Sequence, residues 1–252
     1  SGAVDIGDGF GPTLAINSTG TTTFAGLLTT ASGITQAVGA GRITFRDDTM
    51  IHEGNTSTTF NESVTLDGLT LTSQRDIIFG NNASADDVTL SGAAVVIQTT
   101  GSGGTVTFRS RIDGARDLTV TSTQATSLDG TVGGVEPLSS LTITAGGALS
   151  VSRNISTLNN IALTVQENST STSGDDLAIT GTAVVSSASG AIVLRAGDNV
   201  TVGSTASVTA AGAVEISGDY GNNETAGTVI TLSGPVQGAA VSVYGNSGED
   251  TF

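Results

Sequence analysis

The residues of this chain that are best suited to chemistry are acidic, and several of them come in adjacent pairs. These pairs are Asp47-Asp48, Asp86-Asp87 and Asp175-Asp176. Carboxylate oxygens in turn-rich segments are typical ligands of hard divalent cations such as Ca²⁺. The same side chains also accept hydrogen bonds from backbone N–H groups in turns, which requires no metal. The sequence leaves both interpretations open.

The segment 245–252, GNSGEDTF, is similar to a single copy of the calcium-binding nonapeptide G-G-x-G-x-D-x-U. The matching residues are Gly245, Gly248, Asp250 and Phe252, whereas Asn246 stands where the repeat has its second Gly. Because calcium in such repeats is held between successive turns, one copy supplies only part of a site.

A calcium site here would therefore take ligands from two neighbouring turns. We expect a carboxylate from Asp250 and backbone carbonyls from Gly245 and Ser247. The nearest candidates earlier in the chain lie in SGDYGNNE, namely Asp219, Asn222, Asn223 and Glu224. Calcium accepts about six to eight oxygen ligands in flexible arrangements. The alternative interpretation is a set of hydrated acidic turns that bind no ion.

Catalytic chemistry has little support in the sequence. His52 is the sole histidine, and neither a nucleophile nor an orienting carboxylate can be assigned to it, since the adjacent Glu53 points to the opposite face of a strand. Arg109, Arg111 and Arg116 cluster with Asp113 and Asp117. This cluster predicts an exposed ion-pair network or, alternatively, a face that binds acidic sugars.

Composition argues for a thin core. The chain has 252 residues, including 35 Gly, 2 Tyr, 7 Phe and no Trp, so few large side chains are present to fill a deep interior. Its net charge is −15 with no Lys, and such a surface repels nucleic acids and anionic lipids. No apolar run approaches the length of a membrane span. We therefore expect an elongated protein without nucleic-acid partners.

A near-repeat identifies the architecture. The segment 176–197 is followed at once by a similar segment, 198–219, in which Gly190-Ala191-Ile192 returns as Gly212-Ala213-Val214. Each segment contains three short runs of the form apolar-polar-apolar, separated by Gly, Ser or Asn. Three strands per 22 residues indicate one coil of an all-β, right-handed parallel β-solenoid. The inward side chains should stack in columns: Leu177, Ile179, Ile192, Leu194, Val200, Val202, Val214 and Ile216.

The period extends along the chain with interruptions. Leu118 and Leu141 are 23 residues apart, whereas Leu141 and Leu177 are 36 apart, which predicts one coil plus an insertion. Insertions are expected near 167–175 and 220–227. We interpret 1–252 as a single solenoid segment excerpted from a longer chain. An immunoglobulin-like β-sandwich is the alternative fold.

Residues 104–156, beginning GTVTFRSRIDGARDLTVTS and continuing through LSSLTITAGGALS, carry a family resemblance. The pattern resembles the repeat regions of very large bacterial surface proteins, the filamentous-haemagglutinin-like and autotransporter-like adhesins. Segments 176–244 and 241–252 are similar in style. The resemblance implies export to the cell surface, a β-helical shaft and a role in adhesion, biofilm or envelope structure, with no catalytic residues.

Partners follow from the unpaired strands expected at the ends of a solenoid segment and from the same resemblance. The shaft would contact neighbouring solenoid segments, or copies of itself end to end, and surface glycans of a host or matrix. The competing function is a polysaccharide-binding or polysaccharide-processing β-helix. Its processing form needs a base and aromatic platforms for sugars, and the chain offers only Tyr220 and Tyr244 beside its Phe residues.

Overall fold

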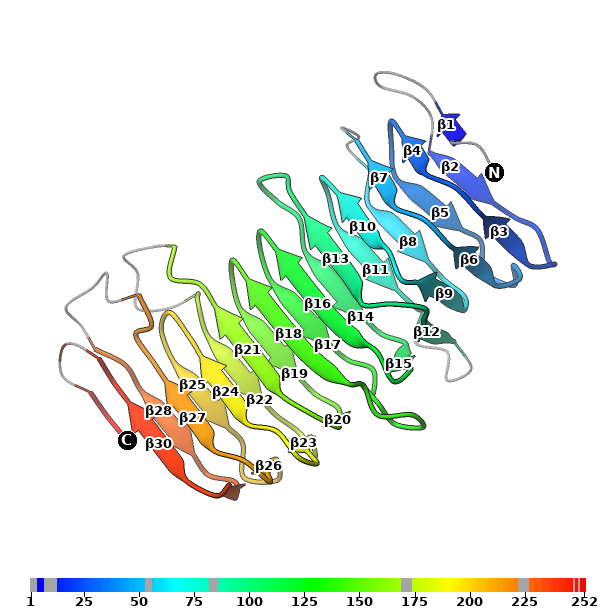
Figure 1. Ribbon diagram of the computed structural model, residues 1–252. Coiled ribbons are helices and arrows are strands. Elements are labelled where there is room, and N and C mark those ends of the chain that lie inside the picture. The colour runs from blue at the N-terminus through cyan, green and yellow to red at the C-terminus, as the bar shows by residue number, and fades with distance from the viewer. Residues whose placement is uncertain are drawn as a thin grey trace.

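The computed structural model of the chain describes residues 4–6, 13–52, 56–81, 86–168, 174–221, 227–246, 248 and 250–252. Within these residues every regular element is a β-strand, and all strand pairs are parallel. Figure 1 shows the strands of successive coils side by side along one axis, from the blue N-terminus to the red C-terminus. The described strands form successive coils of roughly 23 residues, close to the predicted 22. The predicted parallel β-solenoid is confirmed.

Sheet A is continuous and contains 11 strands. They are β1 (Val4–Ile6), β4 (Leu28–Thr30), β7 (Thr49–Ile51), β10 (Thr70–Ser73), β13 (Val95–Thr99), β16 (Asp117–Ser122), β18 (Ser140–Ala145), β21 (Ile161–Val165), β24 (Ile192–Arg195), β27 (Val214–Ser217) and β30 (Val241–Tyr244). One strand of each coil enters this sheet, so sheet A records the stacking of the whole described chain.

Sheet B contains the 10 strands that follow those of sheet A in each coil. They are β2 (Leu14–Ile16), β5 (Ile34–Gln36), β8 (Thr58–Phe60), β11 (Ile77–Phe79), β14 (Val106–Phe108), β17 (Thr126–Leu128), β19 (Leu149–Val151), β22 (Leu177–Ile179), β25 (Val200–Val202) and β28 (Ile230–Leu232). We call the segment that joins a strand of sheet A to the next strand of sheet B an A–B corner.

The third face, sheet C, consists of a 5-stranded and a 4-stranded part. The first part holds β3 (Thr22–Phe24), β6 (Ile43–Phe45), β9 (Val64–Asp67), β12 (Asp87–Ser91) and β15 (Arg111–Asp113). The second holds β20 (Ile155–Thr157), β23 (Val184–Ser187), β26 (Ser207–Ala210) and β29 (Val236–Gln237). Between them the coil contributes isolated bridges, from Val132 to Ile112 and Ile155 and from Leu138 to Thr157.

Alternation along each strand builds the core. In β24 and β25, for example, the first and third residues are buried and the middle one is half-buried, because successive side chains point to opposite faces. Parallel pairing then stacks like residues, and all eight predicted inward residues, 177, 179, 192, 194, 200, 202, 214 and 216, are buried. The predicted columns are therefore confirmed.

Phenylalanine stacking fills the N-terminal half of the core. The rings of Phe60, Phe79 and Phe108 stack in sheet B with centroids 5.2 and 5.0 Å apart. One coil earlier that column holds the buried Gln36 instead, and Phe45 of sheet C packs edge-on against Phe60 at 5.7 Å. The Phe45 ring of sheet C thus fills the core where sheet B has no aromatic side chain. This keeps the packing dense along the axis.

One predicted register is wrong. Leu141 stacks on Ile161, 20 residues later, and Leu177 belongs to sheet B, where it pairs with Leu149. The long coil begins only afterwards, since Ile161 pairs with Ile192, 31 residues on. The two expected insertions fall at A–B corners, between β21 and β22 and between β27 and β28. Residues 169–173 and 222–226 lie outside the described residues.

Candidate functional site

The predicted calcium turn is only partly assembled in the described residues. The Asp250 carboxylate occupies the space that a side chain at Gly245 would fill, and its Oδ1 accepts the N–H of Thr228 at 3.2 Å. Asn246 Nδ2 donates to the carbonyl of Asp219 at 2.9 Å. The structure thus brings Gly245 and Asp250 together and places the turn on Asp219.

The other predicted ligands, Ser247 and Glu224, lie outside the described residues, as do Asn222 and Asn223. Within the part of the chain that the structure describes, no three acidic or histidine side chains are placed to hold one metal ion. Calcium at this turn therefore stays a prediction.

Most acidic corners have a structural role that the sequence left open. A side-chain oxygen of the corner residue accepts a backbone N–H from the next coil. The acceptor and donor pairs are Asp48 with Thr70, Asp76 with Thr105, Asp113 with Val135, Asn154 with Val184, Asn160 with Ala191, Asp176 with Asn199, and Asn199 with Val229, at 2.8–3.1 Å. These bonds satisfy N–H groups that the sheets leave unpaired at the turns.

The pKa values of two corner aspartates, Asp76 and Asp86, are shifted in opposite directions. Burial raises the pKa of Asp76, but hydrogen bonds from Thr105 and Ser57 outweigh it, so the pKa lies below its ordinary value of 3.8. Burial, together with the negative charges of Glu62 and Asp87, raises the pKa of Asp86 to about 6. Asp86 Oδ2 is buried and has no hydrogen-bond donor.

We expect Asp86→Asn to stabilise the protein at pH 7 and to flatten its pH dependence. The folded state holds the Asp86 proton more tightly than the unfolded state does, so its contribution to stability is complete below pH 3.8. That contribution is lost as the pH rises to about 6. Removing the charge should raise the free energy of unfolding at pH 7 by on the order of 2 kcal/mol.

Thermal unfolding of the wild type and the variant between pH 4 and 7 measures this effect. The exposed Asp47 provides a control, and Asp47→Asn should follow the wild type at each pH. Parallel curves for Asp86→Asn and the wild type would contradict the buried, charge-repelled environment.

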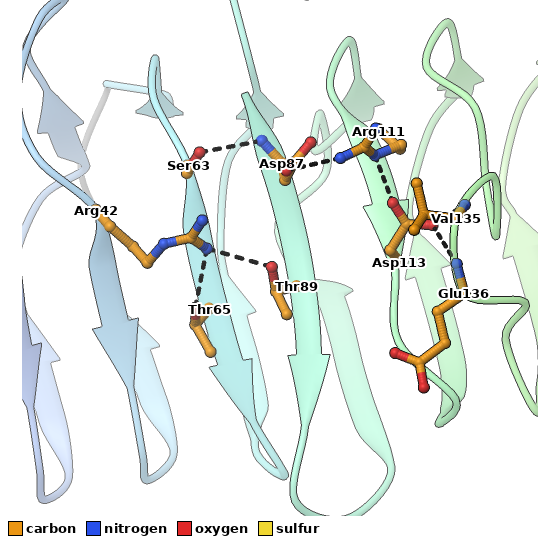
Figure 2. Close-up of polar contacts among 9 residues, drawn as sticks. All are labelled: Arg42, Ser63, Thr65, Asp87, Thr89, Arg111, Asp113, Val135 and Glu136. Carbon is orange, nitrogen blue, oxygen red and sulfur yellow. Dashed lines mark hydrogen bonds and ion pairs between the residues drawn. The ribbon is translucent and has the colours of Figure 1, made fainter. Parts of the chain in front are cut away.

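Of the predicted arginine cluster, Arg111 and Asp113 form ion pairs, together with Asp87, on the outer face of sheet C (Figure 2). Arg111 Nη2 lies 2.9 Å from Asp87 Oδ2, and Arg111 also pairs with Asp113. Arg42, two coils before Asp87 on the same face, donates to Thr65 and Thr89 at 3.2 Å each. The network therefore runs across successive coils of the solenoid.

Arg109 and Arg116 do not join this network. Arg109 is exposed between β14 and β15, and Arg116 donates to the carbonyl of Ala115 at 3.1 Å. Asp117 instead accepts from Ser140 Oγ at 2.6 Å. Because Asp87 and Asp113 surround Arg111, its charge is neutralised, and this weakens the alternative of a face that binds acidic sugars.

A shallow groove of about 380 Å³ lies beside the network, where sheet C is interrupted. Segment 131–137 forms one side, and residues of β20 and β23 form the other. Its lining combines hydroxyl and amide groups, from Thr131, Ser156 and Asn154, with the apolar side chains of Val135 and Val184. No sequence pattern predicted this groove, which arises because one coil contributes isolated bridges instead of a strand to sheet C.

His52 is exposed and its backbone N–H donates to the Thr30 carbonyl at 2.7 Å. Glu53 lies outside the described residues.

No family model, curated protein or solved structure matches the chain. Among the described residues, no helix is long and apolar enough to span a membrane.

Proposed function

We propose that the chain is a non-catalytic structural or adhesive stalk segment of an exported bacterial surface or matrix protein. The observation that carries the proposal is the unbroken pairing of 11 strands in sheet A over one continuous apolar core. Every coil is bonded to the next, so load applied along the axis is shared by the backbone hydrogen bonds of parallel strands. The resemblance of 104–156 to adhesin repeats supports the same function.

The outer face of sheet B suits a contact surface that stays hydrated. Its central column is formed mostly of short polar side chains: Thr35, Thr59, Ile78, Thr107, Ser127, Ser150, Ala178, Thr201 and Thr231. Hydroxyl-rich, uncharged surfaces of this kind hydrogen-bond readily to matrix or host glycans. We therefore include such glycans as partners.

Neighbouring solenoid segments, or copies end to end, are the other proposed partners. At the C-terminal edge β30 is the last strand of sheet A, and Thr251 forms a single bridge to Val229 beside β28. An apolar pocket of about 390 Å³ at this edge is lined by Ile230, Leu232, Val243 and Phe252. An edge strand beside an open apolar pocket favours the addition of further strands with the same polarity.

Pulling the chain from its two ends tests the stalk. At roughly 4.8 Å per coil, the stack of sheet A spans about 50 Å. Because each coil contacts only its neighbours, we expect extension to proceed in steps of one or a few coils, each releasing about 75 Å of chain. Loss of the whole fold in one low-force event would contradict a load-bearing shaft, as would turnover of any acidic polysaccharide.

The groove beside Val132 favours a second candidate, binding of a polysaccharide. Val135 and Val38 are matched test positions, being 72% and 73% exposed, but only Val135 lines the groove. If the chain binds glycans there, Val135→Asp abolishes retention on a glycan panel and Val38→Asp does not. Equal retention of both variants would assign any glycan binding to the hydroxyl-rich faces.

A further inference from the structure

Three successive A–B corners near the C-terminal end each bury one aspartate. Asp175, Asp198 and Asp219 are 3, 1 and 0% exposed. Their backbones are bonded in series, since Asp198 N–H donates to the Asp175 carbonyl at 3.0 Å and Asp219 N–H to the Asp198 carbonyl at 3.1 Å. We call this set the aspartate corner.

Glu167 adds a fourth carboxylate to the aspartate corner. A side chain at Gly197 would come within 2.9 Å of both Glu167 Cα and Asp175 Cβ, so only glycine lets these coils approach. The Glu167 side chain then runs past Gly221, two residues after Asp219. Oε2 of Glu167 and Oδ1 of Asp219 are both shielded from solvent.

Among the described residues, no ion pair joins Asp198 to an arginine. The sequence has no Lys, and all eight Arg belong to described residues, so none is hidden in the neighbouring segments 169–173 and 222–226. Seven of the eight lie between 42 and 153. Arg195 is adjacent, but its guanidinium pairs with Glu215 at 2.8 Å and lies over Tyr220 at 4.9 Å.

Asp198 is the residue that points to a ligand. Its Oδ2 accepts the N–H of Asp175 at 2.9 Å, which fixes the carboxylate inside the corner. Its Oδ1 is buried and has no hydrogen-bond partner. A buried carboxylate oxygen without donor or counter-charge is costly, and cation coordination is one of the ways proteins offset that cost.

We propose that the aspartate corner binds a hard divalent cation, calcium, through Asp198 Oδ1. The Thr228 hydroxyl donates to the Asp198 carbonyl at 2.6 Å, so the corner combines carboxylate, carbonyl and hydroxyl oxygens, the ligand type that calcium prefers. Since no three described carboxylates converge on one point, carbonyls and water must complete the shell. The ion would connect successive coils at the A–B corners where the two expected insertions lie.

The aspartate corner shares Asp219 with the predicted turn at Asp250, but its proposed ligand is Asp198, and the proposal is independent of the stalk proposal. Titration calorimetry with CaCl₂ at 0.15 M NaCl, on chain stripped with chelator, tests it together with thermal unfolding. We expect saturable binding and a higher melting temperature with calcium. Asp198→Asn keeps an acceptor for the Asp175 N–H but removes the charge. It should lose the saturable heat, melt higher than wild type in chelator and gain nothing from calcium.

Two controls separate binding from charge and from folding. Asp129→Asn removes an exposed acid at another corner and should bind calcium as the wild type does. Asp250→Asn should also keep the heat, which distinguishes the two sites. If Asp198→Asn does not fold, Asp198→Ser replaces it with the same expectation. Absence of saturable heat in the wild type, or wild-type binding by the Asp198 variant, would overturn the proposal.

Discussion

Replacing Ile192 with Asp will destabilise the solenoid by at least about 4 kcal/mol. Ile192 is fully buried between Ile161 and Val214 in the central sheet A column. The substitution removes an apolar contact in both directions along the axis. It also places a carboxylate where the neighbouring coils offer no donor, because their side chains at this position are aliphatic. Urea unfolding followed by circular dichroism measures the loss.

Thr201→Asp is the matched control for this variant. Thr201 lies on the outward face of β25, between Ala178 and Thr231, and is half-buried. The same charge therefore enters the same part of the solenoid but remains hydrated, and we expect a cost below about 1 kcal/mol. Equal stabilities for the two variants would show that the inward and outward faces are assigned the wrong way round.

The inward columns were predictable because two periods agree in the sequence. Alternation along a strand sets which side chains point inward, and stacking requires similar residues about one coil apart. Val214 and Ile216 repeat Ile192 and Leu194 at the same spacing, so local pattern and long-range repeat gave the same answer. Agreement between levels of this kind makes a prediction reliable.

Corners were less predictable because their length varies without disturbing the strands. Ile192 pairs with Val214, 22 residues on, but Leu177 pairs with Val200, 23 residues on. A repeat of 22 aligns Asp198 with Asp176, whereas the structure stacks it on Asp175. That single residue decides which aspartate is buried, and the sequence pattern carries no signal for it.

The sequence also does not reveal that sheet C supplies core volume where sheet B has a polar residue. Gln36 occupies a core position in sheet B, where its Nε2 donates to the Gly41 carbonyl at 2.8 Å and its Oε1 accepts the Glu62 N–H at 3.1 Å. A polar residue is tolerated there because these bonds satisfy it and Phe45 supplies the missing volume from sheet C. Neither condition can be read from one strand alone.

Phe79→Ala will cost about 4 kcal/mol or more, because it removes the middle ring of a continuous stack. Phe79 is fully buried, and its ring lies 24° from the plane of Phe60 and 3° from that of Phe108. The variant loses aromatic contact on both sides. The cavity that it leaves cannot collapse easily, since backbone pairing fixes the distance between coils.

Because coils interact only with their neighbours, this cavity should also uncouple the N-terminal coils from the rest. We expect hydrogen exchange to accelerate in β8, β11 and β14 and to change little beyond β21. Phe24→Ala is the control: Phe24 is half-buried and stacks on one ring alone, Phe45, at 5.3 Å, so its loss should cost roughly half as much. Equal costs for Phe79→Ala and Phe24→Ala would mean that the rings act separately rather than as one stack.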